Sequence, residues 1–335
     1  MHADASRWFA DHTWHEPRWS VADLVRAKGS RSISVALPAL NEAKTVAGVV
    51  GIVMPLVGTL VDECVVVDSG STDDTIAVAR AAGARVVRHR DILPDVPVRP
   101  GKGEVLWRAL AATVGDILVF LDTDLVRPDP GFVPALLGPL LTGPGIHLVK
   151  GFYRRPIGIE NTDADIDGDI DHDIDADSGG GRVTELLARP VLAALRPELS
   201  GVIQPLGGEY ALTRAFAETV PFAAGYGVEI GLLLDAYQRY GLAGLAQVNL
   251  GVRRHRNRSL PELGVMARQI LGTALTRRGV TEPDETTSFT QFTQVDGTWL
   301  AHDHDVCLAD RPPLEVLVGR VGCADQVGRW SPAGR

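Results

Sequence analysis

Two aspartates separated by one threonine follow the apolar run 117–121: they are Asp122 and Asp124, on either side of Thr123. The run predicts a buried strand, so both carboxylates would lie at its carboxyl end, the edge where open α/β sheets bind ligands. Such carboxylates suit a hard cation such as Mg²⁺ or Mn²⁺, which would neutralise a diphosphate during group transfer. The alternative is a solvated pair in a turn, because aspartate is common where strands end.

Two further segments end predicted strands with small and acidic residues, PALNEA (38–43) and VVVDSGSTDDT (65–75). Carboxylates at Glu42 and Asp68 would accept hydrogen bonds from ribose hydroxyls or from a base N–H in a cleft between the strand ends. The alternative is that Asp68 and Ser69 only terminate their strand. No G-x-G-x-x-G follows the first strand and no G-x-x-x-x-G-K-[ST] occurs. This argues against dinucleotide enzymes and P-loop NTPases.

Two glycine-containing segments place cations beside flexible backbone. In RPGKGEVLW (99–107), glycines flank Lys102, which predicts a mobile loop that carries a cation to a phosphate, or else a flexible surface turn. In GGGRVTE (179–185), glycines precede a predicted helix start. Free backbone N–H groups there, with Arg182 and the Thr184 hydroxyl, predict a site for a phosphate or carboxylate. An ordinary glycine-rich linker with a capping threonine is the alternative.

The segment GVRRHRNR (251–258) holds one histidine among four arginines. A neutral imidazole at His255 would complete the metal shell, and Arg253 and Asn257 would then face a polar ligand. Taken alone, a single histidine is more often structural than a metal ligand.

The elements that must position these residues alternate along the first half of the chain. Strands are predicted at 33–40, 63–71, 84–89 and 116–124, with helices at 41–57, 72–83 and 103–113. Continuous apolar strands separated by helices are typical of a parallel, doubly wound sheet in an α/β protein.

The second half is less regular, and we expect it to cap the same sheet. Strands are expected at 147–155 and 246–258, and helices at 182–197, 227–241 and 259–279, the last with Ser259 as N-cap. We divide the chain into a lead-in (1–30), a first half (31–145), a second half (146–280) that contains the aspartate-rich insertion 163–177, and an extended tail (281–335) with a possible dimer contact.

Composition excludes several classes of function. Eight alternating aspartates at 163–177 account for most of the net charge of −9, so the rest of the 335-residue chain is nearly neutral and predicts no nucleic-acid partner. No apolar run reaches the roughly 20 residues that span a membrane.

Three scattered cysteines without a C-x-x-C pair favour neither disulfides nor zinc, and Cys64 is expected to be a buried thiol in the cytoplasm. The aspartate repeat lacks the pattern of an EF-hand loop and is expected to be a solvated, disordered insertion.

Taken together, PALNEA, VVVDSGSTDDT, the GKGE loop and VFLDTDL resemble the nucleotide-sugar half of glycosyltransferases with the Rossmann-like GT-A fold. The later motifs GGGRVTELLARPVLAALRPEL, QPLGGEYALTR, GYGVEIGLL and QVNLGVRRHRNR resemble the glucosyl-3-phosphoglycerate synthases of actinobacteria, a family of retaining enzymes. The resemblance covers roughly residues 30–280, and it implies that 31–145 is a nucleotide-sugar-binding half and 146–280 an acceptor-binding half. The aspartate insertion departs from the family, in which this loop is shorter.

The resemblance implies transfer of glucose from UDP-glucose to the 2-hydroxyl of 3-phosphoglycerate, toward methylglucose lipopolysaccharides, with Mg²⁺ or Mn²⁺ as cofactor. It implies that Asp122, Asp124 and His255 bind the metal, and it favours a homodimer. The donor site falls on Pro38, Ala39, Leu40, Glu42, Asp68, Ser69, Lys102, Asp122 and Thr123. The acceptor site falls on Gly181, Arg182, Val183, Thr184, Tyr226, Arg253 and Asn257.

For catalysis the resemblance points to Glu229, Asp124 and Lys102, with Glu229 beside the donor glucose and the acceptor. Retention by attack on the leaving-group face makes Glu229 an orienting residue, whereas a double displacement makes it the nucleophile. Other functions stay open at this point: another soluble GT-A glycosyltransferase such as a mannosyltransferase, a nucleotidyltransferase, or a non-catalytic Ca²⁺-binding protein acting through 163–177.

Overall fold

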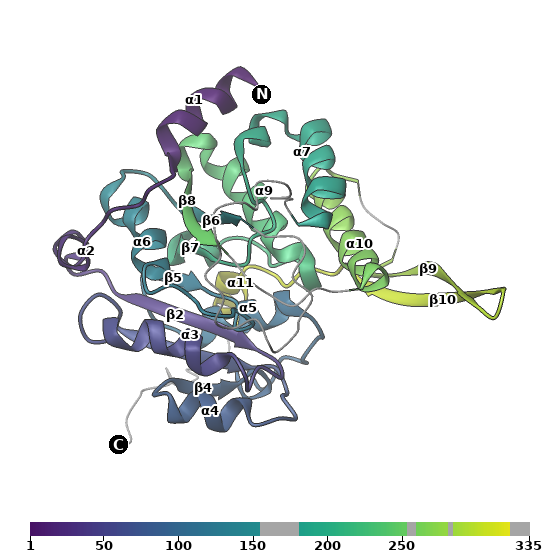
Figure 1. Ribbon diagram of the computed structural model, residues 1–335, viewed down its shortest axis with the longest axis horizontal. Helices are drawn as coiled ribbons and strands as arrows, with labels where there is room; N and C mark the ends of the chain where they lie inside the picture. The colour runs from purple at the N-terminus through teal and green to yellow at the C-terminus, as the bar shows by residue number, and fades with distance from the viewer. Residues whose placement is uncertain (155–180, 253–258, 281–283, 322–335) are drawn as a thin grey trace, which may run out of the picture.

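The computed structural model describes residues 1–154, 181–252, 259–280 and 284–321, which form a central sheet covered by helices (Figure 1). The sheet has eight strands in the order β1-β8-β6-β7-β5-β2-β3-β4. All neighbouring pairs are parallel except those made by β7, which runs antiparallel to both β5 and β6. The predicted mostly parallel, doubly wound α/β sheet is therefore confirmed.

The first half supplies four parallel strands of this sheet. They are β2 (Ile33–Ala39), β3 (Glu63–Asp68), β4 (Arg85–Arg88) and β5 (Ile117–Phe120), and the helices between them are α3 (Val46–Val53), η1 (Met54–Leu56), α4 (Thr75–Ala81), η2 (His89–Asp91) and α5 (Lys102–Ala112). Residue Val35 of β2 pairs with Cys64 of β3 on one side and with Val119 of β5 on the other. This register aligns the carboxyl ends of β2, β3 and β5 at one edge.

The second half extends the same sheet. Its strands are β6 (Leu148–Arg154), β7 (Tyr210–Thr213) and β8 (Leu245–Val252), and its helices are α6 (Phe132–Thr142), η3 (Thr184–Ala188), α7 (Arg189–Leu195), η4 (Pro197–Gly201), α8 (Arg214–Ala217), η5 (Gly225–Gly227), α9 (Val228–Tyr240), η6 (Leu242–Gly244) and α10 (Leu260–Thr276). The helix predicted at 182–197 thus divides into the π-helical turn η3 and α7. Ser259 caps α10 in a capping box with Glu262, as predicted.

Alternating side chains of the strands fill two cores, one on each face of the sheet. Val35 and Leu37 of β2 enter the core beneath α2 (Val21–Lys28), α3, α4 and α6, whereas Ala36 enters the core beneath α5, α7, α9 and α10. Cys64 is buried as a free thiol, as predicted, and burial raises its pKa to about 12 with a further contribution from Glu63.

The described residues before 30 and after 284 form helices and strands that the sequence did not predict. The lead-in forms α1 (Ala3–His12), β1 (Thr13–Trp14) and α2 (Val21–Lys28), and β1 pairs with β8 at the edge of the sheet. The indole of Trp8 donates a hydrogen bond to Leu245 O. The tail forms the hairpin β9 (Thr286–Val295) and β10 (Thr298–Cys307), which projects beyond α10, and then α11 (Leu314–Val321). The described part of the tail thus contains a hairpin and a helix that the sequence did not predict.

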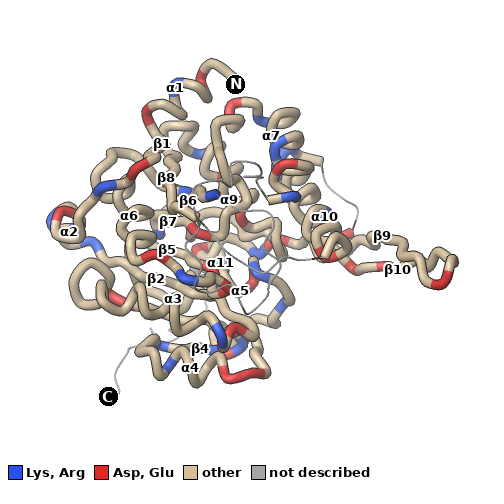
Figure 2. The backbone as a smooth tube through the Cα atoms, viewed as in Figure 1, with Lys and Arg blue, Asp and Glu red and all other residues tan. Residues whose placement is uncertain are grey.

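A buried ionic network fastens the tail to α5. Arg311 donates to both carboxylate oxygens of Glu104, at 2.5 and 2.9 Å, and Arg108 donates to the same carboxylate at 2.6 Å. Arg311 also lies over the ring of Trp107. Elsewhere, acidic and basic positions are interspersed over the described chain without a face of one sign in this view (Figure 2). No helix in the described ranges is long and apolar enough to cross a membrane.

Candidate active site

Three charged side chains from three elements meet at the carboxyl edge of the sheet. Lys102 begins α5, Asp122 lies two residues beyond β5, and Glu229 lies in the first turn of α9. The ammonium of Lys102 is 2.6 Å from Asp122 Oδ1 and 2.7 Å from Glu229 Oε1. Their side chains are 17%, 19% and 4% exposed, so this is a largely buried cation between two carboxylates. We call these three residues the central triad.

The carboxylates keep Lys102 charged. Burial alone would lower the pKa of its ammonium, but Asp122 and Glu229 raise that pKa well above the usual value for lysine. The central triad can therefore present a permanent cation to a phosphate.

The glycines beside Lys102 allow close packing of backbones. Gly101 has φ +106°, and a Cβ added there would lie 2.9 Å from Gly225 Cα. A Cβ added at Gly103 would lie 1.9 Å from Ala223 O. The start of α5 is thus pressed against the segment that leads into α9. Lys102 therefore begins a helix, where the sequence predicted a loop, and the glycines let this helix start approach its neighbour closely.

The predicted donor residues collect at the same edge of the sheet. Thr123 Oγ1 donates to Pro38 O at 2.7 Å, which ties the strand end of β5 to that of β2. Ser69 donates to Ala39 O from both its backbone N–H and its hydroxyl, at 2.9 and 3.0 Å. Leu40, the next residue, is 53% exposed. These strand ends lie next to each other and to the aspartates.

Two of the predicted donor carboxylates take part in local turns. Asp68 is buried and accepts hydrogen bonds from the backbone N–H groups of Gly70 and Ser71, at 3.1 and 3.2 Å. Glu42 accepts a hydrogen bond from the hydroxyl of Thr45 at 2.9 Å. Both contacts shape the strand ends, and a role of either carboxylate in donor binding stays a prediction.

The described part of the predicted acceptor site lies around α10. The turn η3, which contains Thr184, and the turn η5, which contains Tyr226, both contact this helix. Thr184 is buried, Arg182 is exposed, and Gly181 O accepts the backbone N–H of Glu185 at 3.0 Å. The backbone N–H of Tyr226 donates to the Gln269 side chain at 2.9 Å. Val183 is half-buried, and Arg253, His255, Asn257 and the insertion 163–177 lie outside the described residues.

The sequence interpretation assigned no role to a second buried lysine beside the central triad. Lys150 of β6 donates to Gly207 O at 2.5 Å, and its ammonium lies 4.7 Å from the centre of the Tyr210 ring. Burial lowers the pKa of Lys150 to about 8, against the opposing influence of Glu229. Glu209, fully buried in the motif QPLGGEY, directly precedes Tyr210 in sequence, and its carboxylate favours the charged form of Lys150. Charged residues inside apolar strand segments were the signal that could have revealed this group.

The described aspartates fit a hard divalent cation. Asp122 and Asp124 are both only half-buried and offer carboxylate oxygens, the donors that Mg²⁺ and Mn²⁺ prefer. Gly208 leaves room for the first of them, since a Cβ there would lie 2.3 Å from Asp122 Oδ2. Within the described ranges no group of three or more His, Cys, Asp or Glu side chains gathers as a complete metal shell. The third predicted ligand, His255, lies outside those ranges.

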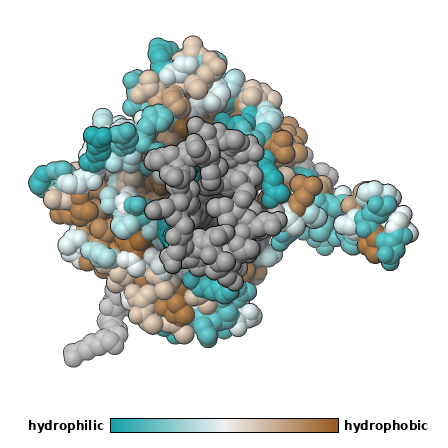
Figure 3. All heavy atoms as spheres, viewed as in Figure 1, coloured by the Kyte–Doolittle hydropathy of each residue, from teal (hydrophilic) through white to brown (hydrophobic). Residues whose placement is uncertain are grey.

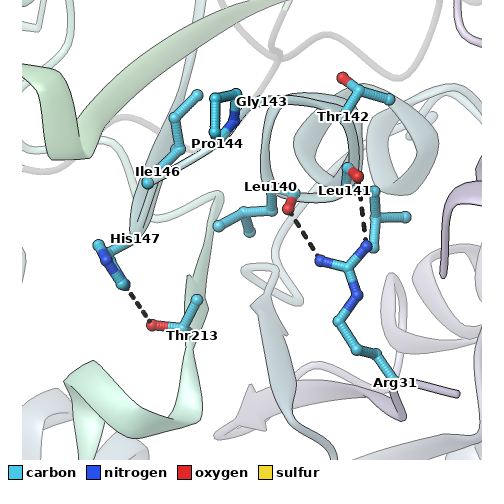
Figure 4. Close-up of a pocket in the computed structure, with 10 residues that line it drawn as sticks. Arg31, Leu140, Leu141, Thr142, Gly143, Pro144, Ile146, His147 and Thr213 are labelled. Atoms are coloured by element: carbon cyan, nitrogen blue, oxygen red, sulfur yellow. Dashed lines mark hydrogen bonds between the residues drawn. The ribbon is translucent and has the colours of Figure 1, made fainter. Parts of the chain in front are cut away.

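A surface pocket of about 410 Å³ lies at the opposite edge of the sheet (Figure 4). Arg31, at the amino end of β2, donates to the carbonyl oxygens of Leu140 and Leu141, both at 3.2 Å. His147, at the amino end of β6, is hydrogen-bonded to the Thr213 hydroxyl at 3.1 Å. These polar groups stabilise the fold, and the pocket is remote from the strand ends that carry the central triad.

Comparison with known proteins gives consistent matches. Residues 34–164 match the family described as Glycosyl transferase family 2. The glucosyl-3-phosphoglycerate synthase of Mycolicibacterium smegmatis is 58% identical to this chain, over 93% of this chain and 98% of its own length. A crystal structure of the Mycobacterium tuberculosis enzyme of that name, with Mn²⁺, UDP and phosphoglyceric acid, is 55% identical, with a TM-score of 0.81 over 91% of this chain and 98% of that chain.

Further crystal structures of the M. tuberculosis enzyme hold other ligands. One, with Mn²⁺, UDP-glucose and phosphoglyceric acid, has a TM-score of 0.79 and 55% identity over 91% of this chain and 98% of that chain. Another holds Mn²⁺, UDP and glucosyl-3-phosphoglycerate, and a third holds Mg²⁺ with UDP.

Proposed function

This chain belongs to the glucosyl-3-phosphoglycerate synthase family, a group with the GT-A fold, and we propose that its reaction centre is the central triad Lys102, Asp122 and Glu229. The enzyme transfers glucose from UDP-glucose to 3-phosphoglycerate and uses Mg²⁺ or Mn²⁺. The observation that supports the proposed centre is the ammonium between two carboxylates at the carboxyl edge of the sheet. We further propose the 2-hydroxyl as acceptor atom and a step toward methylglucose lipopolysaccharides.

At the leaving-group end, Asp122, Asp124 and His255 would hold the divalent cation. When bound, the cation supplies positive charge that stabilises the departing diphosphate. Lys102 adds a second cation close to Asp122, and its raised pKa keeps it protonated through the pH range of the reaction. Pro38, Ala39, Leu40, Ser69 and Thr123 are the proposed walls of the uridine site, since they line the neighbouring strand ends.

At the sugar end, Glu229 would stabilise the positive charge that develops on glucose in an oxocarbenium-like transition state. Its ion pair with Lys102, at 2.7 Å, reduces its strength as a nucleophile. This favours attack of the acceptor on the leaving-group face, with retention and with a phosphate oxygen taking the acceptor proton. A double displacement predicts instead a glucosyl ester on Glu229, which mass spectrometry of the quenched enzyme would detect.

For the acceptor we propose the predicted set Gly181, Arg182, Val183, Thr184, Tyr226, Arg253 and Asn257. The described members support this because η3 and η5 converge on α10. The exposed guanidinium of Arg182 and the backbone N–H groups at the start of the helical segment suit an acceptor with both a carboxylate and a phosphate.

The test is turnover of UDP-glucose with Mg²⁺ against 3-phosphoglycerate, glycerate and phosphoenolpyruvate. We expect UDP release only with 3-phosphoglycerate, and a product whose anomeric proton shows by NMR that the α configuration is retained. Unchanged UDP-glucose in the presence of 3-phosphoglycerate would refute the assignment. Release of glucose 1-phosphate in place of UDP, with the uridylyl group transferred to the acceptor, would indicate a nucleotidyltransferase.

We also propose a homodimer formed through the hairpin β9–β10, which reaches away from the body as an arm (Figure 3). Phe292 and Trp299 lie on the same face of the hairpin and are 63% and 65% exposed. An isolated two-stranded sheet is only marginally stable in water, so a partner surface would stabilise it. Light scattering should give twice the chain mass for the wild type and a monomer for Phe292→Ser with Trp299→Ser; a monomeric wild type would contradict the proposal.

We place the enzyme in the cytoplasm. The described cysteines, Cys64 and Cys307, are free thiols, as expected in a reducing compartment. Cell fractionation with an antibody against the chain tests this, and recovery in the membrane or the medium would refute it.

A further inference from the structure

Strand β6 makes two hydrogen bonds to the turn that precedes β7. The ammonium of Lys150 donates to Gly207 O at 2.5 Å, and the neighbouring backbone N–H of Gly151 donates to Glu209 O at 2.8 Å. The approach is close, because a Cβ added at Gly207 would lie 2.9 Å from Gly151 O. The turn is therefore fixed relative to β6 by one backbone and one side-chain hydrogen bond.

The other side of the same turn lies directly on Asp122. A Cβ at Gly208 would approach all three carboxylate atoms of Asp122, within 2.3 to 2.6 Å. The backbone at Gly208 is thus the surface against which this carboxylate rests. Any shift of the diglycine turn, residues 207–208, changes the space open to Asp122.

Lys150 is a buried lysine, and burial of a charge costs free energy unless the charge is paired or hydrogen-bonded. Its side chain is buried, and Asp122, Glu209 and Glu229 favour its charged form whereas Lys102 opposes it. Its ammonium contacts a backbone carbonyl and an aromatic ring, whereas the ammonium of Lys102 pairs with both Asp122 and Glu229. The direct hydrogen bond of Lys150 is therefore with the turn, at Gly207 O.

We propose that Lys150 is a positioning residue that holds the diglycine turn against Asp122 and thereby orients this carboxylate toward the divalent cation. The inference rests on the proposed function, in which Asp122 is a metal ligand. Groups one step removed from a metal ligand alter metal affinity by about 10- to 100-fold when they are removed, because they fix the orientation of the ligand.

The test is direct binding of Mn²⁺ in the presence of UDP, followed by the electron paramagnetic resonance of free Mn²⁺. We expect Lys150→Met to weaken Mn²⁺ binding by about tenfold or more. The direction is decisive, since loss of a positive charge near the site would by itself strengthen cation binding. Gly208→Ala should weaken binding as well, because its Cβ displaces Asp122. Lys150→Arg, which keeps a cationic donor, should recover part of the lost affinity.

The matched control is Lys28→Met, which removes another buried lysine whose ion pair with Asp62, at 2.6 Å, lies outside the central triad. It should leave Mn²⁺ binding unchanged. If Lys150→Met does not fold, Lys150→Gln, which is too short to reach Gly207 O, replaces it with the same expectation. Equal or tighter Mn²⁺ binding by the folded variant would overturn the inference. Failure of the proposed function would be seen separately, as a wild type that forms no glucosylated product.

Discussion

Replacement of Lys102 by methionine is the most informative perturbation of the central triad. The substitution keeps the length of the side chain but leaves Asp122 and Glu229 facing each other, since both lie within 2.7 Å of the lost ammonium. Two like charges about 4 to 5 Å apart repel by about 3 to 4 kcal/mol at an effective dielectric constant of about 20. This agrees with the loss of about 3 to 5 kcal/mol when one partner of a buried ion pair is removed.

The pH dependence separates this cause from simple loss of packing. Because the pKa of Lys102 is raised on folding, its contribution to stability is complete at neutral pH and is lost only as the pH rises through the raised value. In Lys102→Met the two carboxylates favour a shared proton, so the variant should regain stability as the pH falls toward 5. The unfolding free energy from urea titrations at several pH values measures both effects.

Activity gives the second measurement for Lys102→Met. Loss of one group that stabilises the departing charge lowers kcat by about 100- to 1,000-fold. Steady-state kinetics with UDP-glucose and 3-phosphoglycerate, under conditions where the variant is folded, would show this fall. A variant that unfolds with the same free energy as the wild type and retains its kcat would refute the reasoning on both counts.

Three further predictions concern the metal site, the packing of α5 and the buried thiol. Asp124→Ala should abolish turnover, whereas deletion of 163–177 should leave most of it, and the reverse result in the same assay would move the metal to the aspartate repeat. Gly103→Ala should lower the unfolding free energy by about 1 to 3 kcal/mol because its Cβ meets a carbonyl oxygen at 1.9 Å. The control Gly51→Ala, in α3 with nothing within 4 Å, should raise it by about 0.5 to 1 kcal/mol. Cys64, with its pKa raised to about 12, should resist alkylation at pH 8 until the protein unfolds, and mass spectrometry of native, labelled protein showing modified Cys64 would contradict this.

The sheet could be predicted from the sequence because its central strands are buried on both faces. Continuous apolar runs such as that of β5 mark such strands, and their ends mark the ligand-binding edge. The hairpin β9–β10 gave no such signal, since the half-buried positions of β9 are Thr287, Phe289, Gln291 and Thr293, which are mostly polar and give no apolar alternation.

Residue types in the site were predictable, but their contacts were not. The motifs identified Lys102 and Asp122, yet the ion pair with Glu229 joins residues more than a hundred positions apart in sequence and depends on how α9 returns to the sheet. The glycine before Lys102 suggested mobility because sequence does not show the backbone that packs against it. Lys150 attracted no interpretation for the same reason, since its partner is a carbonyl oxygen that any residue could supply.

The ion pair between Arg311 of the tail and Glu104 of α5 affects where the chain can be cut into separate fragments. Glu104 lies two residues after Lys102, and it shares its carboxylate between Arg108 of the same helix and Arg311 near the end of the described chain. A ribosome must therefore translate past Arg311 before the helix that carries Lys102 gains its last partner. A donor-binding fragment cut before this residue would leave one oxygen of a buried carboxylate without its partner, so complementation between separately expressed halves should require the tail.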